Sequence, residues 1–261
     1  SANTTAANNV AVGYQALLTN TEGAQNTAVG WNALRATTTG DDNVAVGKRA
    51  LDANTTASSN TAVGTNAGLV ITTGAANTIV GSGAGQNMTT AANCLILGYE
   101  AGITGSPGGN LTTADNSIRL GDENIQNAHI QVDWTVASDQ RDKTDFTDLD
   151  LGLNFVKELS PVTYKWDKRS NYGNKNADDY DLNAQTPDGT HKEDWLDIGF
   201  KAQEVEALEI AAGYNKDNKT NLTTTLTSDG KQMGLQYSKF VPILVKAIQE
   251  LSEKVAALEA K

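Results

Sequence analysis

A serine and a lysine stand five residues apart at Ser138 and Lys143, and together they have the chemistry to cut a peptide bond. A serine hydroxyl is a weak nucleophile, so it needs a neighbouring base to take its proton. A lysine amine can be that base when it is neutral, and burial or a nearby cation favours the neutral form. The two histidines of the chain, His129 and His191, are not adjacent to Ser138. Ser138 is therefore the predicted nucleophile and Lys143 the predicted base.

The residues around this pair define a target bond and two supporting side chains. Ala137 precedes Ser138 and adds little bulk, so the Ala137–Ser138 bond is the predicted cleavage site. Arg141 is a cation that would favour a neutral lysine nearby. Asp139 and Asp142 would favour the charged form of the lysine if they lay close to it. We therefore expect them to bond to the backbone or to pair with Arg141. Taken alone, this hexapeptide fits a solvated charged loop better than a catalytic site, because a serine and a lysine at this spacing recur by chance.

The composition of the chain changes at the same point. Residues 1–137 hold four Lys or Arg and nine Asp or Glu, whereas residues 138–261 hold sixteen and twenty-two. We therefore predict two domains, a β-repeat fibre segment at 1–137 and a charged globular domain at 138–261. Both parts are acidic, with net charges of −5 and −6, and the sequence has no basic cluster. This charge argues against nucleic acid and against an anionic membrane surface as partners.

The first domain is built from a repeat of 17 residues. Six glycines recur at this spacing and a seventh follows after 23: Gly13, Gly30, Gly47, Gly64, Gly81, Gly98 and Gly121. An aliphatic residue precedes each glycine, and an alanine stands three residues after each of the first six. Short runs of Val, Ala, Thr and Ile bounded by Asn and Gly are typical of strands and tight turns. The fixed period predicts a stacked coil of the β-roll or β-helix type.

A single chain of such a coil is expected to enclose little core, because its apolar residues are mostly Val, Ala and Leu. Several chains packed together would bury more, so we expect a homotrimer. The pattern Asn-x-Ala-x-Gly-x-x-Ala over residues 9–125 resembles the head repeats of trimeric bacterial adhesins, which form a β-roll. Residues 81–85 look like a phosphate loop but keep the repeat register, so we interpret them as structural. Cys94 is interpreted as a small buried hydrophobe.

The sequence pattern of the second domain predicts an α+β fold. Residues 151–159 have helical spacing of apolar side chains, and a Ser-Pro pair ends the helix. Residues 162–166 alternate as a strand, and residues 198–200 predict a short strand that leads into a helix at 202–208. The polar residues 167–194 predict a long loop or a flexible insertion.

The C-terminal residues from about 239 to 261 predict a coiled-coil helix. Its apolar residues are spaced alternately three and four apart: Val241, Leu244, Ile248, Leu251, Val255 and Leu258. An amphipathic helix packed on its own domain is the simpler alternative, and β-branched residues at a with Leu at d usually favour two strands. The terminal position and the preceding repeat favour a trimeric bundle, which is the interpretation adopted here.

Five segments, in order, carry a resemblance to a known family. They are Ser138-Asp139-x-Arg141-x-Lys143, then 151–166, 199–205, 237–239 and 247–251. Together they resemble the C-terminal, self-cleaving intramolecular chaperone domains of phage tailspikes and tail fibres, over essentially all of 138–261. The resemblance implies a trimeric clamp that aligns three fibre chains and is then released by serine-lysine autoproteolysis. In that context, cleavage between Ala137 and Ser138 becomes the favoured interpretation, with Asp139 and Arg141 in supporting roles.

We therefore expect a tail-fibre or tailspike segment of a virion, assembled in the host cytoplasm and used in host attachment. It would act as a serine-lysine endopeptidase once, on its own chain, with no cofactor and no metal ion. A host cell-surface receptor or glycan is an expected further partner. The alternative is a trimeric cell-surface adhesin whose C-terminal domain caps the fibre without cleavage.

A fibre enzyme that cuts surface polysaccharide is a third interpretation. Its carboxylate pairs would be Asp41/Asp42 or Asp122/Glu123. Adjacent side chains of a strand point to opposite faces, so these pairs are poor catalytic dyads. No apolar run approaches the ~18 residues of a membrane span, so we expect no membrane partner.

Overall fold

The computed structural model describes residues 5–175, 177 and 179–261. The chain divides into two compact units that interleave along the sequence. The first contains the residues up to Gln126 with Asp167–His191 and Thr227–Gln232, and the second contains Asn127–Trp166, Lys192–Leu226 and Met233–Lys261. The units differ from the ranges 1–137 and 138–261 in two ways: two loops from the later range fold with the repeat, and residues 127–137 belong to the second unit. The predicted division into a fibre segment at 1–137 and a second domain at 138–261 stays a prediction.

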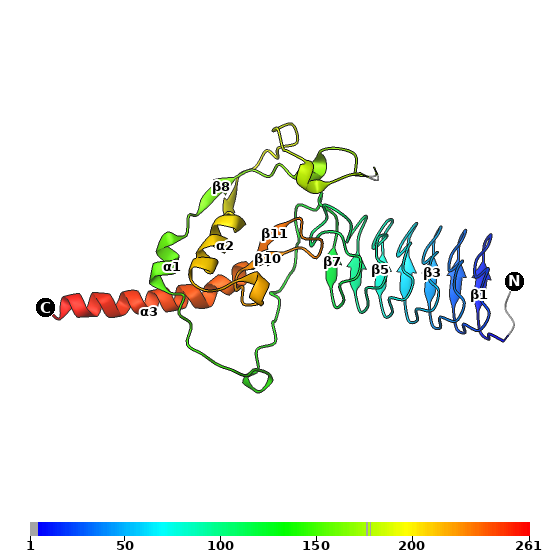
Figure 1. The fold of residues 1–261 in the computed structure, drawn as a ribbon, viewed down its shortest axis with the longest axis horizontal. Coiled ribbons are helices and arrows are strands. Elements are labelled where there is room, and N and C mark those ends of the chain that lie inside the picture. The colour runs from blue at the N-terminus through cyan, green and yellow to red at the C-terminus, as the bar shows by residue number, and fades with distance from the viewer. Residues whose placement is uncertain (1–4, 176, 178) are drawn as a thin grey trace. The chain divides into compact units, whose positions relative to one another are not determined.

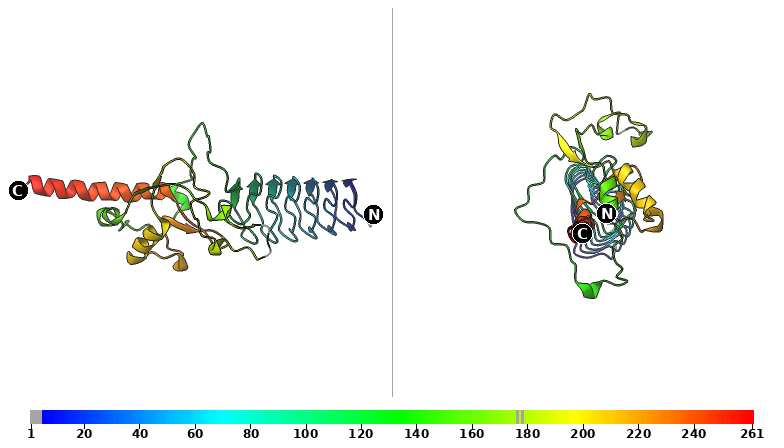
Figure 2. Two further views of the ribbon diagram at one scale, coloured as in Figure 1. Left: turned by 90° about the horizontal axis from the view of Figure 1, so that it is seen from above. Right: turned by 90° about the vertical axis from the view of Figure 1, so that its left-hand side faces the viewer.

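Seven three-residue strands form one parallel sheet in the first unit (Figure 1). In chain order they are β1 (Val10–Val12), β2 (Thr27–Val29), β3 (Val44–Val46), β4 (Thr61–Val63), β5 (Thr78–Val80), β6 (Leu95–Leu97) and β7 (Ile118–Leu120). Val10 pairs with Thr27, 17 positions later, and the last pair, Leu95 with Ile118, is offset by 23. Viewed along the stack, successive coils superpose (Figure 2). The predicted β-roll or β-helix-like coil with a 17-residue period is confirmed.

The glycine that follows each strand lies against the glycine of the next coil. Gly64 has a φ of +138°, and a Cβ added there would lie 2.5 Å from the carbonyl oxygen of Gly81. Any larger residue would be strained by this φ and would also clash with the backbone of the next coil. This close approach explains why the sequence returns to glycine in every repeat.

Each coil closes around an apolar core of its own. Large side chains that are fully buried in the stack are Leu34, Leu51, Ile71, Ile79, Met88 and Ile96. The expectation that a single chain encloses little core is therefore wrong. Inward-facing residues of successive coils stack directly on one another and form one continuous cluster along the solenoid. Cys94 belongs to this cluster and is buried, as predicted.

A ladder of buried asparagines holds successive coils in register. Asn26, Asn43, Asn60 and Asn77 each stand directly before a strand. The backbone N–H of Asn43 donates to Asn26 Oδ1 at 3.0 Å, and that of Asn77 donates to Asn60 Oδ1 at 3.0 Å. A one-residue slip would leave these buried amides without partners, which is costly.

The second unit is the predicted α+β domain with a C-terminal helix, and this part of the fold prediction is also confirmed. Its elements are α1 (Leu153–Glu158), β8 (Val162–Tyr164), β9 (Asp197–Gly199), α2 (Ala202–Ala211), β10 (Thr224–Leu226), β11 (Met233–Leu235) and α3 (Phe240–Glu259). β8 pairs with β9 and β10 with β11, both antiparallel. The core beneath them is made of Leu151, Phe155, Val205, Phe240 and Ile243.

The segment predicted as a long loop or flexible insertion, residues 167–194, is more ordered than that. It contains two 3₁₀ turns, Arg169–Asn171 and Leu182–Ala184, and Leu182 is fully buried. Residues 176 and 178 lie outside the described residues. Most of the segment belongs to the first compact unit, so it is a structural part of the end of the solenoid.

Two loops from the later sequence contact the last coils of the solenoid. Lys168 Nζ donates to the carbonyl oxygen of Glu123 at 2.8 Å, and Lys175 forms an ion pair with the Glu123 carboxylate. From the second loop, an Asp229 oxygen accepts from the backbone N–H of Asn110 at 2.7 Å. An acid of the following coil does the same inside the stack, where Ala24 N–H donates to Asp41 at 2.7 Å. At the end of the solenoid, Asp229 of the loop thus supplies the acceptor for a backbone N–H that an acid of the next coil supplies elsewhere.

Helix α3 leaves its seam uncovered in the single chain. The six seam residues are all exposed: Val241, Leu244, Ile248, Leu251, Val255 and Leu258. Phe240, Ile243 and Ala247 face the domain core instead. In the described part of the chain, none of the helices combines the length and the apolar character needed to cross a membrane.

Candidate functional site

A short turn brings Ser138 and Lys143 into direct contact. Lys143 Nζ donates to Ser138 Oγ at 2.6 Å. Between them lies a single 3₁₀ turn, Gln140–Asp142, which reverses the chain so that the two side chains meet. The backbone N–H of Lys143 closes this turn on the carbonyl oxygen of Gln140 at 3.2 Å. The local sequence therefore brings the predicted nucleophile and the predicted base into hydrogen-bond contact.

Asp139 and Arg141 hold the turn in place. Asp139 caps it by accepting from the backbone N–H of Arg141 at 2.9 Å, and its carboxylate also pairs with the Arg141 guanidinium at 2.6 Å. The hydrogen bonds from the Arg141 side chain and backbone keep the pKa of Asp139 below its ordinary value. Arg141 is thus paired with Asp139, and its structural contribution is to the shape of the turn.

The site is open to water in the single chain. Every residue from 124 to 148 is exposed, and this includes Ser138 and Lys143. Enclosure of a lysine amine in an apolar environment favours its neutral form. The predicted nucleophile and the predicted base are therefore in contact, and no part of the described chain covers them.

The carboxylate pairs considered for polysaccharide cleavage have structural partners. Asp122 and Glu123 follow β7 and do not lie in a strand. The argument that adjacent side chains of a strand point to opposite faces therefore does not apply to them. Both are buried. Glu123 pairs with Lys175, and Asp122 accepts from the backbone N–H of Asn124 at 3.0 Å. Asp41 accepts from the backbone N–H of Ala24 in the preceding coil, as described above. Among the described residues, no group of three or more His, Cys, Asp or Glu is placed to hold a metal ion.

The structure also reveals a buried carboxylate that the sequence reading missed. Glu209 of α2 is 1% exposed. Its Oε1 accepts from the backbone N–H and the hydroxyl of Thr223, both at 2.6 Å, and its Oε2 accepts from the Thr224 hydroxyl at 2.5 Å. It lies four residues after the buried Val205 on the same helical face, a position where an apolar residue is expected. A glutamate at that spacing was the available signal.

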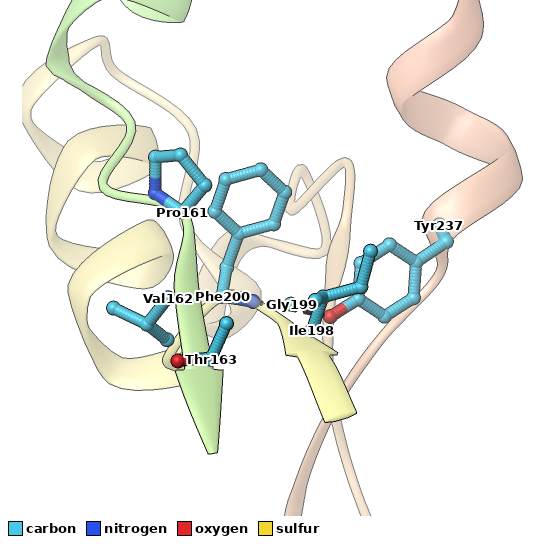
Figure 3. Close-up of a pocket in the computed structure, with 7 residues that line it drawn as sticks. All are labelled: Pro161, Val162, Thr163, Ile198, Gly199, Phe200 and Tyr237. Carbon is cyan, nitrogen blue, oxygen red and sulfur yellow. Dashed lines mark hydrogen bonds between the residues drawn. The ribbon is translucent and has the colours of Figure 1, made fainter. Parts of the chain in front are cut away.

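An apolar pocket of about 550 Å³ opens beside the β8–β9 pair (Figure 3). Its lining includes Pro161 and Val162 at the start of β8, Ile198 of β9, and the stacked rings of Phe200 and Tyr237. Ile198 is 76% exposed. This pocket was not predicted from the sequence, although all its lining residues except Ile198 belong to three of the segments that carry the family resemblance.

The comparison with protein families gives one match. A family model described as Peptidase S74, chaperone of endosialidase, matches residues 138–214. The match begins at Ser138, passes through α1, β8, β9 and α2, and ends before the C-terminal helix. No curated protein and no solved structure matches the chain. The C-terminal part is therefore similar to the chaperone-of-endosialidase family over these residues, and the repeat lies outside the match.

Proposed function

We propose that this chain is a tail-fibre segment of a virion whose C-terminal part is an intramolecular chaperone for homotrimer assembly, removed afterwards by one self-cleavage between Ala137 and Ser138. The observation that carries the proposal is the 2.6 Å hydrogen bond from Lys143 Nζ to Ser138 Oγ. It lies at the first residue of the family match, whose description names both a peptidase and a chaperone.

The cleavage chemistry follows from this contact. Ser138 Oγ attacks the carbonyl carbon of Ala137 while its proton passes to Lys143 Nζ. The C–N bond between Ala137 and Ser138 breaks, and the nitrogen of Ser138 takes the proton back from Lys143. The product is an ester between the Ala137 acyl group and Ser138 Oγ. Water then hydrolyses the ester, which yields a carboxylate at Ala137 and a new N-terminus at Ser138.

Two uncovered apolar surfaces support the homotrimer. Outward-facing residues of the parallel sheet remain exposed along the solenoid, among them Val12, Val63 and Val80. Parallel sheets are normally covered on both faces, and soluble monomers rarely leave a long apolar strip in water. The seam of α3 is the second such strip. A threefold assembly of parallel chains would cover both surfaces.

The loops at the end of the solenoid support the chaperone role. Residues 167–191 and 227–232 belong to the C-terminal part of the sequence, yet they form one compact unit with the repeat. They bond to the last coils through Lys168, Lys175 and Asp229. Repeats of near-identical sequence are prone to pair out of step, and terminal caps fix where a stack ends. These contacts would set the register of the fibre at one end.

Denaturing mass spectrometry of the purified chain tests the cleavage directly. Wild type should yield a fragment beginning at Ser138, whereas Ser138→Ala and Lys143→Ala should remain whole and still form trimers by native mass. Ser160→Ala and Lys157→Ala, which change the same residue types at exposed positions outside the site, should cleave as wild type does. Cleavage at this bond in Ser138→Ala would overturn the mechanism. A wild-type trimer that never cleaves would favour the capped adhesin instead.

A further inference from the structure

A segment just before the proposed cleavage site has the pattern of a β-strand but no partner strand. Residues 130–136, the arm, read Ile-Gln-Val-Asp-Trp-Thr-Val, so apolar and polar residues alternate strictly. In a strand this alternation places Ile130, Val132, Trp134 and Val136 on one face. Within the described residues the arm belongs to none of the sheets. It is a strand sequence held as an open loop.

The apolar face of the arm is uncovered in its own chain. Ile130 is 52% exposed, and Val132, Trp134 and Val136 are 72%, 73% and 79% exposed. A single exposed apolar residue is ordinary, but four in register along one segment are typical of a surface that binds a protein. Tryptophan in particular is enriched at the centre of such interfaces.

The β8–β9 pair offers the complementary surface. It is a sheet of only two strands, which is marginally stable by itself and leaves strand edges unpaired. The apolar pocket beside it is open, and Ile198 projects from β9 with 76% of its surface exposed (Figure 3). Lys165 and Lys239 each stand two residues after a residue that lines the pocket. Neither lysine has an ion-pair partner among the described residues. The polar face of the arm carries one acid, Asp133.

We propose that the arm of one copy adds as a third strand to the β8–β9 pair of a neighbouring copy, with Trp134 seated in the apolar pocket. Strand addition of this kind gives affinity through main-chain bonds and specificity through alternate side chains. The occupant is a second copy of this chain, because the arm is strand-like yet unpaired in its own chain and the proposed homotrimer brings copies together. The inference rests on that proposed function and adds the contact that links assembly to cleavage.

Docking of the arm explains how cleavage would wait for the trimer. Ala137 and Ser138 follow Trp134 by three and four residues. Once the arm is held as a strand, the scissile bond and the Ser138–Lys143 turn are fixed against a protein surface instead of moving in water. Fixing a nucleophile at its target is worth orders of magnitude in rate, and loss of position from a remote change costs about a hundredfold.

Disulfide trapping tests the contact in the full chain with Ser138→Ala, which keeps the arm attached. One copy carries Trp134→Cys and the other, with a distinguishable mass tag, carries Ile198→Cys; both residues are exposed in the chain, so neither change opens a core. The expected product is a disulfide between differently tagged chains. Leu251→Cys in the α3 seam is the control that reports the trimer itself. A bond between two arms, or no bond between the differently tagged chains despite the seam bond, would each overturn the proposal.

A rate measurement gives an independent readout in the cleaving chain. Trp134→Asp and Ile198→Asp should slow cleavage about a hundredfold, whereas Gln131→Asp, on the opposite face of the arm, should leave it unchanged. Wild-type cleavage rates in both variants would refute the docking while leaving the serine-lysine mechanism standing. Absence of a seam bond and of cleavage in the parent chain would refute the proposed function itself.

Discussion

Replacing Glu209 should destabilise the second unit more than any other single polar change in α2. Its carboxylate connects the helix to the start of β10, because it accepts three hydrogen bonds from Thr223 and Thr224. Both threonines are buried, with 0% and 2% of their surfaces exposed. In the wild-type chain these donors therefore bond to the carboxylate in a site without access to water.

The cost can be worked out from these contacts. In Glu209→Ala, the backbone N–H of Thr223 loses its acceptor in a buried site, a loss of about 2 kcal/mol. Two buried hydroxyls lose acceptors as well, at about 1 kcal/mol each because a hydroxyl can rotate to another partner. We expect a total near 4 kcal/mol. Glu209→Gln keeps the shape and one acceptor oxygen, so it should cost about 1–2 kcal/mol, the charged part of the bonds.

The same residue should make stability depend on pH in a defined direction. Burial alone would raise the pKa of Glu209, but the hydrogen bonds from Thr223 and Thr224 outweigh burial and hold it below the ordinary value. A carboxyl whose folded pKa is lowered contributes stability above its unfolded pKa of about 4.3 and loses that contribution as the pH falls through the folded pKa. The difference between wild type and Glu209→Gln should therefore be full at pH 7 and shrink below about pH 4.

Urea unfolding followed by tryptophan fluorescence measures both effects, with Ser138→Ala in every variant so that the chain stays whole. Protein concentration is held constant, because the stability of an oligomer depends on it. Glu204→Gln, an exposed glutamate in the first turn of the same helix, is the matched control and should change stability by less than about 0.5 kcal/mol. The reasoning fails if Glu209→Ala costs less than about 1 kcal/mol, or if the Glu209→Gln difference is as large at pH 3 as at pH 7.

Three further changes probe the solenoid and the seam. Leu51→Ala empties a fully buried site between coils and should cost about 2–5 kcal/mol in thermal or urea unfolding; an unchanged midpoint would contradict the single-chain core. Gly64→Ala forces a Cβ to within 2.5 Å of the Gly81 carbonyl oxygen and should reduce the yield of soluble fibre far more than Gly213→Ala, whose φ is also positive but whose Cβ would meet nothing within 4 Å. Ile248→Asp in the seam should abolish the trimer by native mass and cleavage by denaturing mass together, whereas Gln249→Asp, off the seam, should spare both.

The repeat was predictable because its determinants are local. Gly64 and its equivalents impose both a backbone conformation and a close approach to the next coil, so their spacing in sequence equals the offset between paired strands. The longer last interval adds only a loop, and β6 and β7 remain paired. A period set by the backbone can be read from one sequence without knowing where side chains point.

The interior of the coil was not predictable from composition, because it depends on which positions face inward. The first coils place a leucine four residues after the glycine, as in Leu34 and Leu51. In the fourth coil Gly68 replaces that leucine, and Ile71, three residues later, fills the space instead; a Cβ at Gly68 would lie 3.0 Å from the Ile71 Cδ1 atom. The fifth coil repeats the exchange with Gly85 and Met88. Counting apolar residues misses such compensation, since only the fold shows that the two positions share one volume.

The contacts of the candidate site and of the loops also fall into local ones, which could be predicted, and long-range ones, which could not. Ser138 and Lys143 are five residues apart, so a single turn suffices to join them, and their pairing followed from spacing and resemblance. The hydrogen bond between Asp229 and Asn110 joins residues 119 positions apart, and no local sequence pattern predicts it. The polar composition of residues 167–194 predicted only a loop, because hydrophilic side chains that bond to a distant coil look the same in sequence as those that bond to water.

These long-range contacts separate cutting from release. On the proposed mechanism, hydrolysis at Ala137–Ser138 divides the backbone, but the bonds of Lys168, Lys175 and Asp229 to the last coils are not covalent and lie beyond the cut. The severed part therefore stays on the solenoid until those bonds break, and their loss returns Glu123 and Asn110 to solvent or to a new neighbour. Before cleavage the tether keeps the loops at high effective concentration, so they rebind whenever they open. Cleavage removes this effective concentration without breaking any loop contact. A cap that opened reversibly before the hydrolysis can therefore dissociate irreversibly after it.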